Sequence, residues 1–591
     1  MTDGTEHIEP AVVRAWVAET VRTLGEARGR IDSANVFPVA DADTGTNLFL
    51  TVTEGARAVR EVPDGEPVDT LLLAFARGAL IGARGNSGVI LSEFLRGFAG
   101  ATTLADEPVG SLRVATRLEA AARSSYAAVA VPVPGTILTA ADGAAVAART
   151  AADAGADLSG VVLAARTGAR EAMLRSPREL DVLSRAGVLD AGACGLVLVL
   201  DALCRALGVV VDPADAVDAV DVLGPGAGAG PGPGPGAGDG DALSVAGGTM
   251  APMVSRVTDV GDVRYLTTGG AAPTGATVDA SDAVGPGTGP TLSEHAPVGI
   301  DGEFEVMLVV DGTGSPGLAT RPLADALRAA LTQVGDSVVV VGEGVWQAHV
   351  HTDDPARAVH AVRTVAGDAR VRQVCVRHLA TQVAARGLHG HAVPVPGEAP
   401  EQGVVAITSA PGLVADLARS GAVVLLATDH APTPGEVLRV SVDTGARQVV
   451  VLPGSVLAAD AARAAGGLVG PGAGDLRGIA VLDAPTDLHV VAALATATLG
   501  GGGGGDVVSL MRSTLEDVRA VQVPADGTLV RPALEGLLRS DDEVLTVLPG
   551  RQVDPVVIEV VAGIARQRVP GIEVVVLDSG RDHADLELGA E

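Results

Sequence analysis

Lysine is absent from the 591-residue chain, so all 42 of its basic residues are arginine. This absence excludes every site that depends on a lysine side chain: a Walker-A phosphate site, a Schiff base or a lysine general base. Cysteine occurs only at Cys194, Cys204 and Cys375. Three thiols cannot supply a disulfide framework for a chain of this size, so we expect a reducing, cytoplasmic environment.

Basic residues are also few relative to acidic ones: 42 against 72, which gives a net charge of −30. A surface this acidic argues against general binding to nucleic acid or to anionic membranes. The longest apolar stretch, residues 195–211, is interrupted by Asp201 and Arg205, and the first residues lack the features of a signal peptide. We therefore expect no transmembrane segment.

Composition and periodicity divide the chain into four parts. Residues 6–210 have the 3.6-residue periodicity of helices, which predicts an all-α domain. Residues 211–295 are rich in Gly, Pro and Ala and predict a disordered linker, with one short ordered piece near 254–266. Residues 296–395 follow a β-α-β-β-α-β pattern typical of a small α+β domain, and residues 400–591 predict an α/β domain with a largely parallel sheet.

Asparagine occurs three times, and all three residues lie in two segments of the helical part. The first segment, 35–51, contains Asp41 and Asp43 just before the helix that is opened by Thr44, Gly45, Thr46 and Asn47. In an extended loop, two carboxylates two residues apart point the same way and can share Mg²⁺, and the free N–H groups of the helix start suit a phosphate. The other interpretation is a helix N-cap, and the spacing alone leaves both open.

The second segment, 82–97, combines Gly82, Gly85 and Gly88 with Asn86 and Ser87 before another helix. It predicts a second phosphate-binding helix start to which Arg84 supplies positive charge; the alternative is an ordinary turn with a glycine C-cap. Two such segments in one helical domain, each with scarce asparagine, favour the phosphate interpretation. Residues 132–142 and 184–196 also begin helices, the latter with Asp190 and Gly192.

Taken together, four segments, NVFPVADADTGTNLFLT, GARGNSGVILSEFLRG, PVPGTILT and GVLDAGACGL, resemble the nucleotide-binding L-subunit domain of dihydroxyacetone kinases in order and spacing. The version they resemble is that of the kinase component of bacterial fatty acid kinase. This resemblance implies a barrel of antiparallel helices that holds ATP at one end, with two Mg²⁺ ions bound by Asp41 and Asp43. A third aspartate of the family falls at Val36 here, which leaves Asn35 or Asp32 as the candidate third contact.

The resemblance also implies roles for the neighbouring residues. The phosphates would be cradled by Thr44, Gly45, Thr46 and Asn47, and they would be covered by Arg84, Gly85, Asn86, Ser87 and Gly88. Asp190 and Gly192 match a motif that lines the nucleotide site.

The middle part contains two histidines in AHVHTDDP, at His349 and His351. Residues two apart on a strand face the same side, so this pair can bind one metal ion, or it is simply a pair of hydrogen-bonded strand-end histidines. The resemblance places Asp301 of GIDGEF at the position of a third ligand, which implies a Zn²⁺ site. The C-terminal part resembles a DegV-like α/β unit.

The resemblance implies a kinase that uses ATP to phosphorylate a fatty acid carboxylate presented by a separate DegV-like fatty-acid-binding protein. A kinase for dihydroxyacetone or another small hydroxy-ketone is the alternative enzyme. A non-catalytic nucleotide-binding scaffold is the alternative outside enzymes, and a homodimer stays open.

Overall fold

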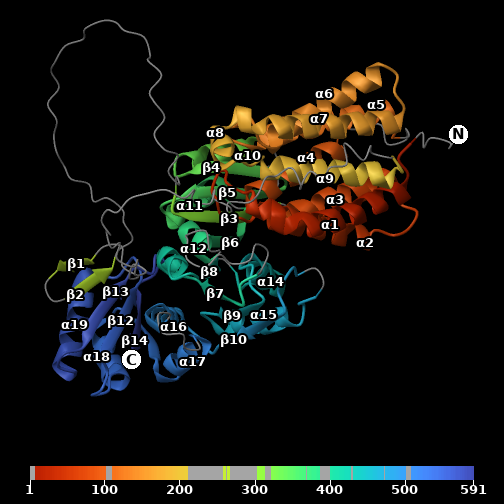
Figure 1. Ribbon diagram of the computed structural model, residues 1–591. Helices are drawn as coiled ribbons and strands as arrows, with labels where there is room; N and C mark the ends of the chain where they lie inside the picture. The colour runs from red at the N-terminus through yellow and green to blue at the C-terminus, as the bar shows by residue number, and fades with distance from the viewer. Residues whose placement is uncertain are drawn as a thin grey trace, which may run out of the picture.

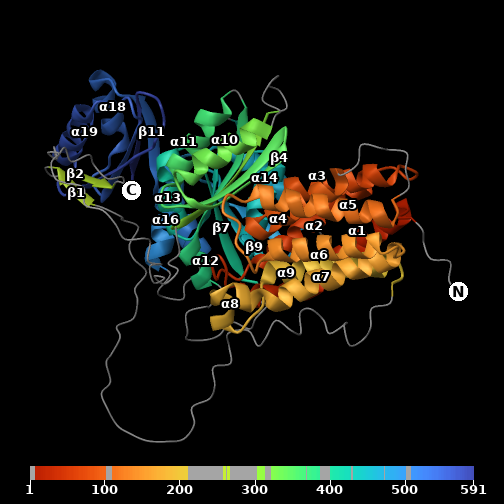
Figure 2. The same ribbon diagram turned by 90° about the horizontal axis from the view of Figure 1, so that it is seen from above.

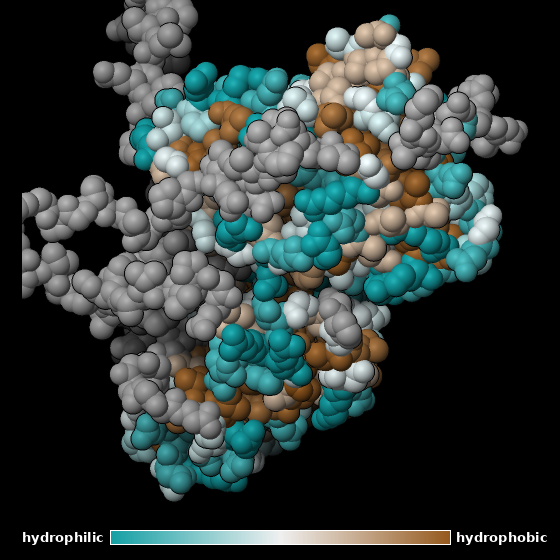
Figure 3. Space-filling view, turned by 45° about the vertical axis from the view of Figure 1, so that its right-hand side comes forward, coloured by the Kyte–Doolittle hydropathy of each residue, from teal (hydrophilic) through white to brown (hydrophobic). Residues whose placement is uncertain are grey.

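The computed structural model describes residues 7–100, 109–209, 257–260, 263–266, 302–312, 321–367, 369–385, 399–427, 430–470, 473–500 and 507–591. Helices fill one end of the molecule, and two sheets with their own helices fill the rest (Figures 1 and 2). Within the described ranges, no helix has both the length and the hydropathy to cross a membrane. On the face drawn in Figure 3, hydrophobic residues lie in patches between hydrophilic ones.

The N-terminal part is helical, as predicted. Its helices are α1 (Pro10–Ser33), α2 (Thr44–Glu61), α3 (Val68–Gly82), α4 (Gly85–Gly100), α5 (Ser111–Ala128), α6 (Ile137–Asp153), α7 (Leu158–Glu179), α8 (Asp181–Ala186) and α9 (Ala191–Ala206). The long helices lie side by side along a common direction in both views (Figures 1 and 2). Trp16 packs edge-on against Phe75 and Phe98 in the core, and its Nε1 donates to Val199 O at 2.9 Å.

The middle part follows the predicted β-α-β-β-α-β order. Its elements are β3 (Phe304–Asp311), α10 (Arg321–Thr332), β4 (Asp336–Glu343), β5 (Val345–Thr352), α11 (Pro355–Ala366), β6 (Arg370–His378) and α12 (Leu379–Ala385). These strands pair in the order β6-β3-β5-β4, all antiparallel. Apolar side chains alternate along them, which buries one face of the sheet under α10 and α11.

The same sheet continues into the C-terminal part. The next elements are β7 (Gln402–Thr408), the short 3₁₀ helix Pro411–Leu413, α13 (Val414–Arg419), β8 (Val423–Leu426), α14 (Pro434–Asp443), β9 (Gln448–Leu452), α15 (Val456–Gly466), β10 (Gly478–Val481) and α16 (Asp487–Gly500). Strands β10, β9, β7 and β8 are parallel, as the sequence predicts, and β8 pairs antiparallel with β6. The pairing therefore runs across the boundary expected between 395 and 400 and makes one eight-stranded sheet.

A second, six-stranded sheet completes the C-terminal part. It contains β1 (Val257–Val260), β2 (Val263–Leu266), β11 (Arg519–Pro524), β12 (Val544–Pro549), β13 (Glu573–Leu577) and β14 (Asp585–Ala590), with the helices α17 (Val507–Asp517), α18 (Gly527–Leu537) and α19 (Pro555–Arg568). The β1–β2 hairpin is the short ordered piece predicted near 254–266, and β2 pairs with β13. The remainder of the predicted linker lies outside the described residues.

One end of the helical domain is docked on the middle part of the eight-stranded sheet. Gln347 Nε2 on β5 donates to Ala83 O at 2.6 Å, and Gly342 N on β4 donates to Glu93 Oε1 at 3.1 Å. Ala130 N, after α5, donates to Val338 O at 3.1 Å. These contacts put the start of α4 next to β3, β4 and β5, which is the end of the domain that carries the predicted site.

Candidate functional site

Asp41 and Asp43 lie in a buried loop that leads into α2. The two residues are only 8% and 5% exposed, respectively. The loop is not extended, as the sequence argument assumed, because Ala42 between them has a φ of 51°. Two of the scarce asparagines hold the carboxylates instead: Asn35 Nδ2 donates to Asp41 Oδ1 at 2.5 Å and Asn47 Nδ2 donates to Asp43 Oδ1 at 2.7 Å.

The start of α2 is capped by a residue outside the carboxylate loop. Asp43 occupies the N-cap position, but its side chain makes no capping hydrogen bond. Asp32 on α1 does this instead, because it accepts from Thr46 N at 2.9 Å and from Thr46 Oγ1 at 2.7 Å. The two loop carboxylates are thus placed at the positive end of the α2 dipole without serving as caps.

The two asparagine-containing segments meet, as predicted. Thr44 Oγ1 donates to Asn35 Oδ1 at 2.9 Å and lies 3.5 Å from Ser87 Oγ on α4. Gly85 has a φ of +55°, and a Cβ added there would lie 2.3 Å from Asn47 Nδ2. Close approach of the two helix starts therefore requires glycine at this position.

The next residues of the α4 start also lie at this junction. A Cβ on Gly88 would lie 2.4 Å from Thr51 Oγ1. The buried Asn86 Oδ1 has no hydrogen-bond partner among the described residues. An unsatisfied buried acceptor of this kind is what a ligand or metal-bound water can satisfy.

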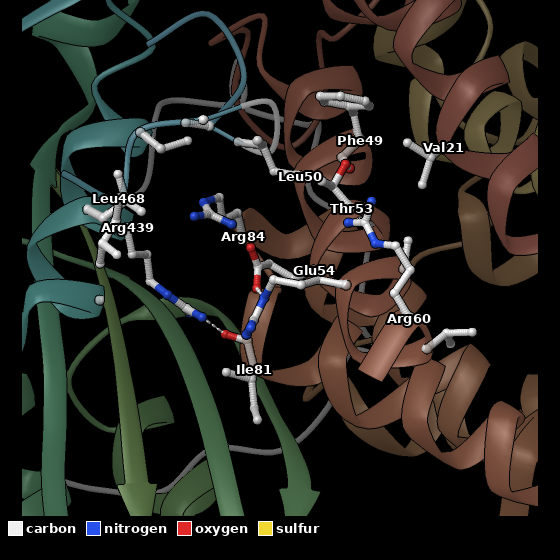
Figure 4. Close-up of a pocket in the computed structure, with 18 of the residues that line it drawn as sticks. Val21, Phe49, Leu50, Thr53, Glu54, Arg60, Ile81, Arg84, Arg439 and Leu468 are labelled. Carbon is white, nitrogen blue, oxygen red and sulfur yellow. Dashed lines mark hydrogen bonds and ion pairs between the residues drawn. The ribbon is translucent and has the colours of Figure 1, made fainter. Parts of the chain in front are cut away.

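The Arg84 side chain connects the helical domain with the C-terminal part of the chain. Its guanidinium forms an ion pair with Asp443 at the end of α14 and donates to Gly82 O at 2.8 Å. It lines a cavity between α2 and α14 (Figure 4). The backbone of Arg84, rather than its charge, is what belongs to the predicted phosphate-binding turn.

Asp190 caps α9 from a buried position. Its Oδ2 accepts from Ala193 N at 2.6 Å, yet burial raises the pKa of this carboxyl group to about 7. A Cβ added to Gly192 would lie 3.2 Å from Ile137 at the start of α6, which brings the third and fourth predicted segments together. Gly195 on α9 packs against Leu48 of α2, so the helix that begins after Asp190 also contacts the helix that begins after Asp43.

The two histidines of the middle part lie side by side on β5, with ring centroids 5.0 Å apart. Together with Glu305 of β3 they offer ligand atoms that all lie within 4.8 Å of one another. His349 Nδ1 lies 3.4 Å from Glu305 Oε1, but neither ring nitrogen makes a hydrogen bond within the described ranges, and burial lowers the pKa of His349 well below the usual range. Both properties suit a neutral metal ligand. Asp301, the expected third ligand, lies outside the described residues.

Arg377 on β6 links this cluster to the first carboxylates. Its Nε donates to Glu305 Oε2 at 2.5 Å, and its Nη2 lies 3.6 Å from Asp43 Oδ2. Sequence reasoning missed both Arg377 and Glu305. For Glu305 the available signal was its place beside the apolar run 306–310 of β3, where a charge is buried only when paired. Arg377 gave no such signal, because β6 also contains Arg370 and Arg372.

A cavity of about 360 Å³ lies beside the site. It is bounded by the loop residues 37–39, by residues 129–131 and 133 that precede α6, and by His351. The cavity therefore touches three of the segments that the sequence analysis singled out, whereas neither Asp41 nor Asp43 lines it.

Two domain families match this chain. Residues 38–205 match the DAK2 domain, and residues 301–386 match the FakA-like middle domain of fatty acid kinases. These matches confirm the resemblance that the four helical segments carry.

Individual proteins are similar over part of the chain. Protein YloV of Bacillus subtilis is 39% identical over 186 residues, which is 32% of this chain and 33% of YloV. The chain thus spans about a third of the length of that relative in the match. A DegV family protein from Corynebacterium glutamicum is 15% identical over 32% of this chain and 96% of its own, with a TM-score of 0.24. The dihydroxyacetone kinase from C. freundii, solved in complex with AMP-PNP and Mg²⁺, is 19% identical over 35% of this chain and 36% of its own, with a TM-score of 0.26.

Proposed function

We propose that this protein is an ATP- and Mg²⁺-dependent kinase that phosphorylates the carboxylate of a fatty acid held by a separate DegV-like acyl-binding protein. In this reaction a carboxylate oxygen bonds to the γ-phosphorus while the bond from that phosphorus to the β–γ bridging oxygen breaks. The products are an acyl phosphate and ADP. The observation that carries the proposal is the meeting of the Asp41–Asp43 loop with the start of α4, within the part of the chain that matches the DAK2 domain.

The residues at this junction fit a nucleotide with its metal ions. Carboxylate and amide oxygens of Asp41, Asp43 and Asn35 are the hard donors that Mg²⁺ prefers, and we expect two ions there. Mg²⁺ would neutralise the phosphate oxygens as charge develops on the leaving group. The starts of α2 and α4 supply backbone N–H groups for phosphates, and Asn86 Oδ1 supplies an unsatisfied acceptor.

The chain's own residues act on this reaction by positioning. Asn35 and Asn47 each donate to one carboxylate, so the two carboxylates keep their places before any ligand arrives. Burial of the loop excludes water and strengthens every charge interaction in it. No lysine is needed, because phosphoryl transfer depends on orientation and charge neutralisation more than on covalent chemistry.

Arg377 supplies the positive charge that the chain cannot take from lysine. It approaches Asp43 from the sheet side, and Glu305 fixes its orientation. We therefore assign Arg377 as a positioning residue that holds Asp43. Docking of the middle part then completes the site that the helical domain begins.

Glu305, His349 and His351 form a second candidate metal site, which we assign to Zn²⁺. Since Glu305 also pairs with Arg377, a metal ion there would fix the strand ends that carry Arg377 toward Asp43. Its role in this proposal is structural support of the kinase site.

The test uses the full-length protein with MgATP and a DegV-like acyl-binding protein loaded with fatty acid. We expect ADP release together with an acyl phosphate that hydroxylamine traps as a hydroxamate, and we expect Asp41→Ala to abolish both. A parallel reaction with dihydroxyacetone tests the alternative kinase. The proposal is wrong if no hydroxamate forms, or if Asp41→Ala matches the unchanged protein; ATP binding by calorimetry without turnover would favour the scaffold.

A further inference from the structure

A large cavity among the described residues lies apart from the Asp41–Asp43 carboxylates. It has a volume of about 980 Å³ and is formed between α1 and α2 of the helical domain and α14 of the C-terminal part (Figure 4). Its volume is in the upper range of small-molecule pockets. Neither Asp41 nor Asp43 contributes to its lining, so it is a second cavity rather than an extension of the kinase site.

The lining is rich in positive charge for a chain with a net charge of −30. Five arginines line the cavity, against two carboxylates, Glu54 and Glu436. Both carboxylates are already engaged: Glu54 pairs with Arg57, and Glu436 closes the capping box at the start of α14. Three of the five arginines are paired as well: Arg14 with Asp64, Arg57 with Glu54 and Glu61, and Arg84 with Asp443. Among the described residues, Arg60 and Arg439 form no ion pair, so they are the excess positive charge of the cavity.

Arg439 carries much of this excess. Its guanidinium donates to Ile81 O across the domain junction and forms no ion pair with any described residue. Burial, and then the neighbouring charge of Arg84, lower its pKa to about 10. Asp443 pairs with Arg84 and offsets part of this effect, but it forms no ion pair with Arg439. An anion placed against the Arg439 guanidinium in this partly dry cavity would complete its pairing.

Much of the rest of the wall is apolar. Val21, Phe49 and Leu50 face the cavity from the helical domain, and Leu468 faces it from the opposite side (Figure 4). Leu468 is 55% exposed and Ile81 is 43% exposed. Large apolar side chains exposed at the wall of a concave site mark a surface that a ligand or partner covers. A small inorganic anion would leave this wall uncovered.

We propose that this cavity binds an anionic amphiphile, with its acidic head group against Arg439 and its hydrocarbon chain along the apolar wall of α1 and α2. A nucleotide fits the lining less well, because the described lining residues include one aromatic side chain, Phe49, and two hydroxyl side chains, Thr53 and Thr433. The head group is a carboxylate or a phosphate, since a guanidinium donates hydrogen bonds to either. This site does not depend on the kinase reaction.

Isothermal titration calorimetry on the full-length protein tests the proposal with decanoate and decyl phosphate, each below its micelle concentration. Decanol and inorganic phosphate are the comparison ligands, because each has only one half of the amphiphile. We expect at least one of the two amphiphiles to bind saturably at one site per chain. We expect both comparison ligands to bind at least tenfold more weakly. The ratio between decanoate and decyl phosphate identifies the preferred head group.

The variant Arg439→Gln should weaken binding at least tenfold, and Arg439→Lys should restore most of it because the charge returns. Arg463→Gln, on the exposed face of α15, is the matched control and should bind as the unchanged protein does. The proposal is overturned if Arg439→Gln binds normally, if decanol binds as well as decanoate, or if binding is not saturable.

Asp41→Asn separates this site from the kinase site. Amphiphile binding should survive that substitution while ATP turnover is lost. Loss of amphiphile binding in Asp41→Asn would place the ligand at the kinase site and overturn the proposal. Failure of the kinase reaction with normal amphiphile binding would leave this second site standing.

Discussion

Arg377 Nη2 on β6 lies 3.6 Å from Asp43 Oδ2 at the start of α2, so a residue of the sheet contacts the carboxylate loop of the helical domain. If Arg377 positions Asp43, Arg377→Gln should lower kcat about 100-fold, the usual scale for loss of one charge-stabilising group. It should also tighten Mn²⁺ binding, because a cation that competes for Asp43 has been removed.

The measurements are steady-state kinetics and Mn²⁺ titration followed by electron paramagnetic resonance. Arg372→Gln is the matched control, since Arg372 lies on the same strand but pairs with Asp311 at 3.3 Å. A merely structural role for Arg377 predicts loss of stability without tighter Mn²⁺ binding. That outcome would remove Arg377 from the site.

Gly85 provides a test of the close approach between α2 and α4. Gly85→Ala places a Cβ 2.3 Å from Asn47 Nδ2, so Asn47 must move away from Asp43. We expect kcat/KM for ATP to fall at least tenfold. Gly155→Ala is the control, because Gly155 also has a positive φ, of +81°, but has open space around it. Equal loss of activity in both variants would show that backbone strain alone explains the effect.

The side-chain amide of Asn47 should contribute to activity because it holds Asp43 in place. Asn47→Ala leaves Asp43 Oδ1 without its 2.7 Å donor, and a lost hydrogen bond to a buried charged group costs about 1–3 kcal/mol. We expect kcat/KM for ATP to fall about 10- to 100-fold, and Asn86→Ala should show a smaller loss. Thr53→Ala removes a hydroxyl on the same helix that only donates to Phe49 O, and it should leave activity unchanged. Unchanged kcat/KM in Asn47→Ala contradicts the assigned role.

The raised pKa of Asp190 leads to a prediction of how the stability of the protein depends on pH. Its pKa of about 7 in the folded chain lies above its ordinary value of 3.8, so the folded state holds this proton more tightly than the unfolded state. The resulting stability is fully present below about pH 4 and is lost as the pH rises to about 7. Asp190→Asn keeps an acceptor for Ala193 N but removes the titration.

The free energy of unfolding of Asp190→Asn, relative to the unchanged protein, should therefore rise by roughly 2–3 kcal/mol between pH 5 and pH 8. Chemical unfolding at the two pH values measures it. A difference that is the same at both values contradicts the raised pKa.

The candidate Zn²⁺ site is testable with Co²⁺ as a spectroscopic substitute. Glu305, His349 and His351 should bind one ion per chain and give visible absorption bands typical of a four-coordinate site. His349→Ala should abolish the bands, whereas His360→Ala, at an exposed position on α11, should not. Bands that persist in His349→Ala would place the ion elsewhere.

Local patterns predicted much of this fold because they report local structure. The helices expected in 6–210 are confirmed over the described residues 7–100 and 109–209, and so is the β-α-β-β-α-β order of the middle part. The first two site segments were predicted to meet, and Thr44 and Ser87 bring them together. The pairing of β6 with β8 could not be predicted, because register between distant strands depends on tertiary packing.

The same limit applies to the site. The sequence identified Asp41, Asp43 and the two histidines because each lies in a short polar motif. Arg377 is one of three arginines on β6 and Glu305 is one charge beside an apolar run of β3, and only the docked sheet shows that they face Asp43 and the histidines. The sequence also assigned the charge of Arg84 to phosphate, whereas its guanidinium pairs with Asp443.

Strand β6 is held on both sides by the eight-stranded sheet. Val376 is paired with Val424 on β8, and the next residue, Arg377, lies 3.6 Å from Asp43. Because backbone hydrogen bonds to β3 and β8 fix the register of β6, Arg377 can leave Asp43 only together with the sheet. The contact between Gln347 and Ala83 lies on the same boundary between sheet and helices. The geometry of the Asp41–Asp43 loop therefore depends on how the helical domain is docked on the sheet.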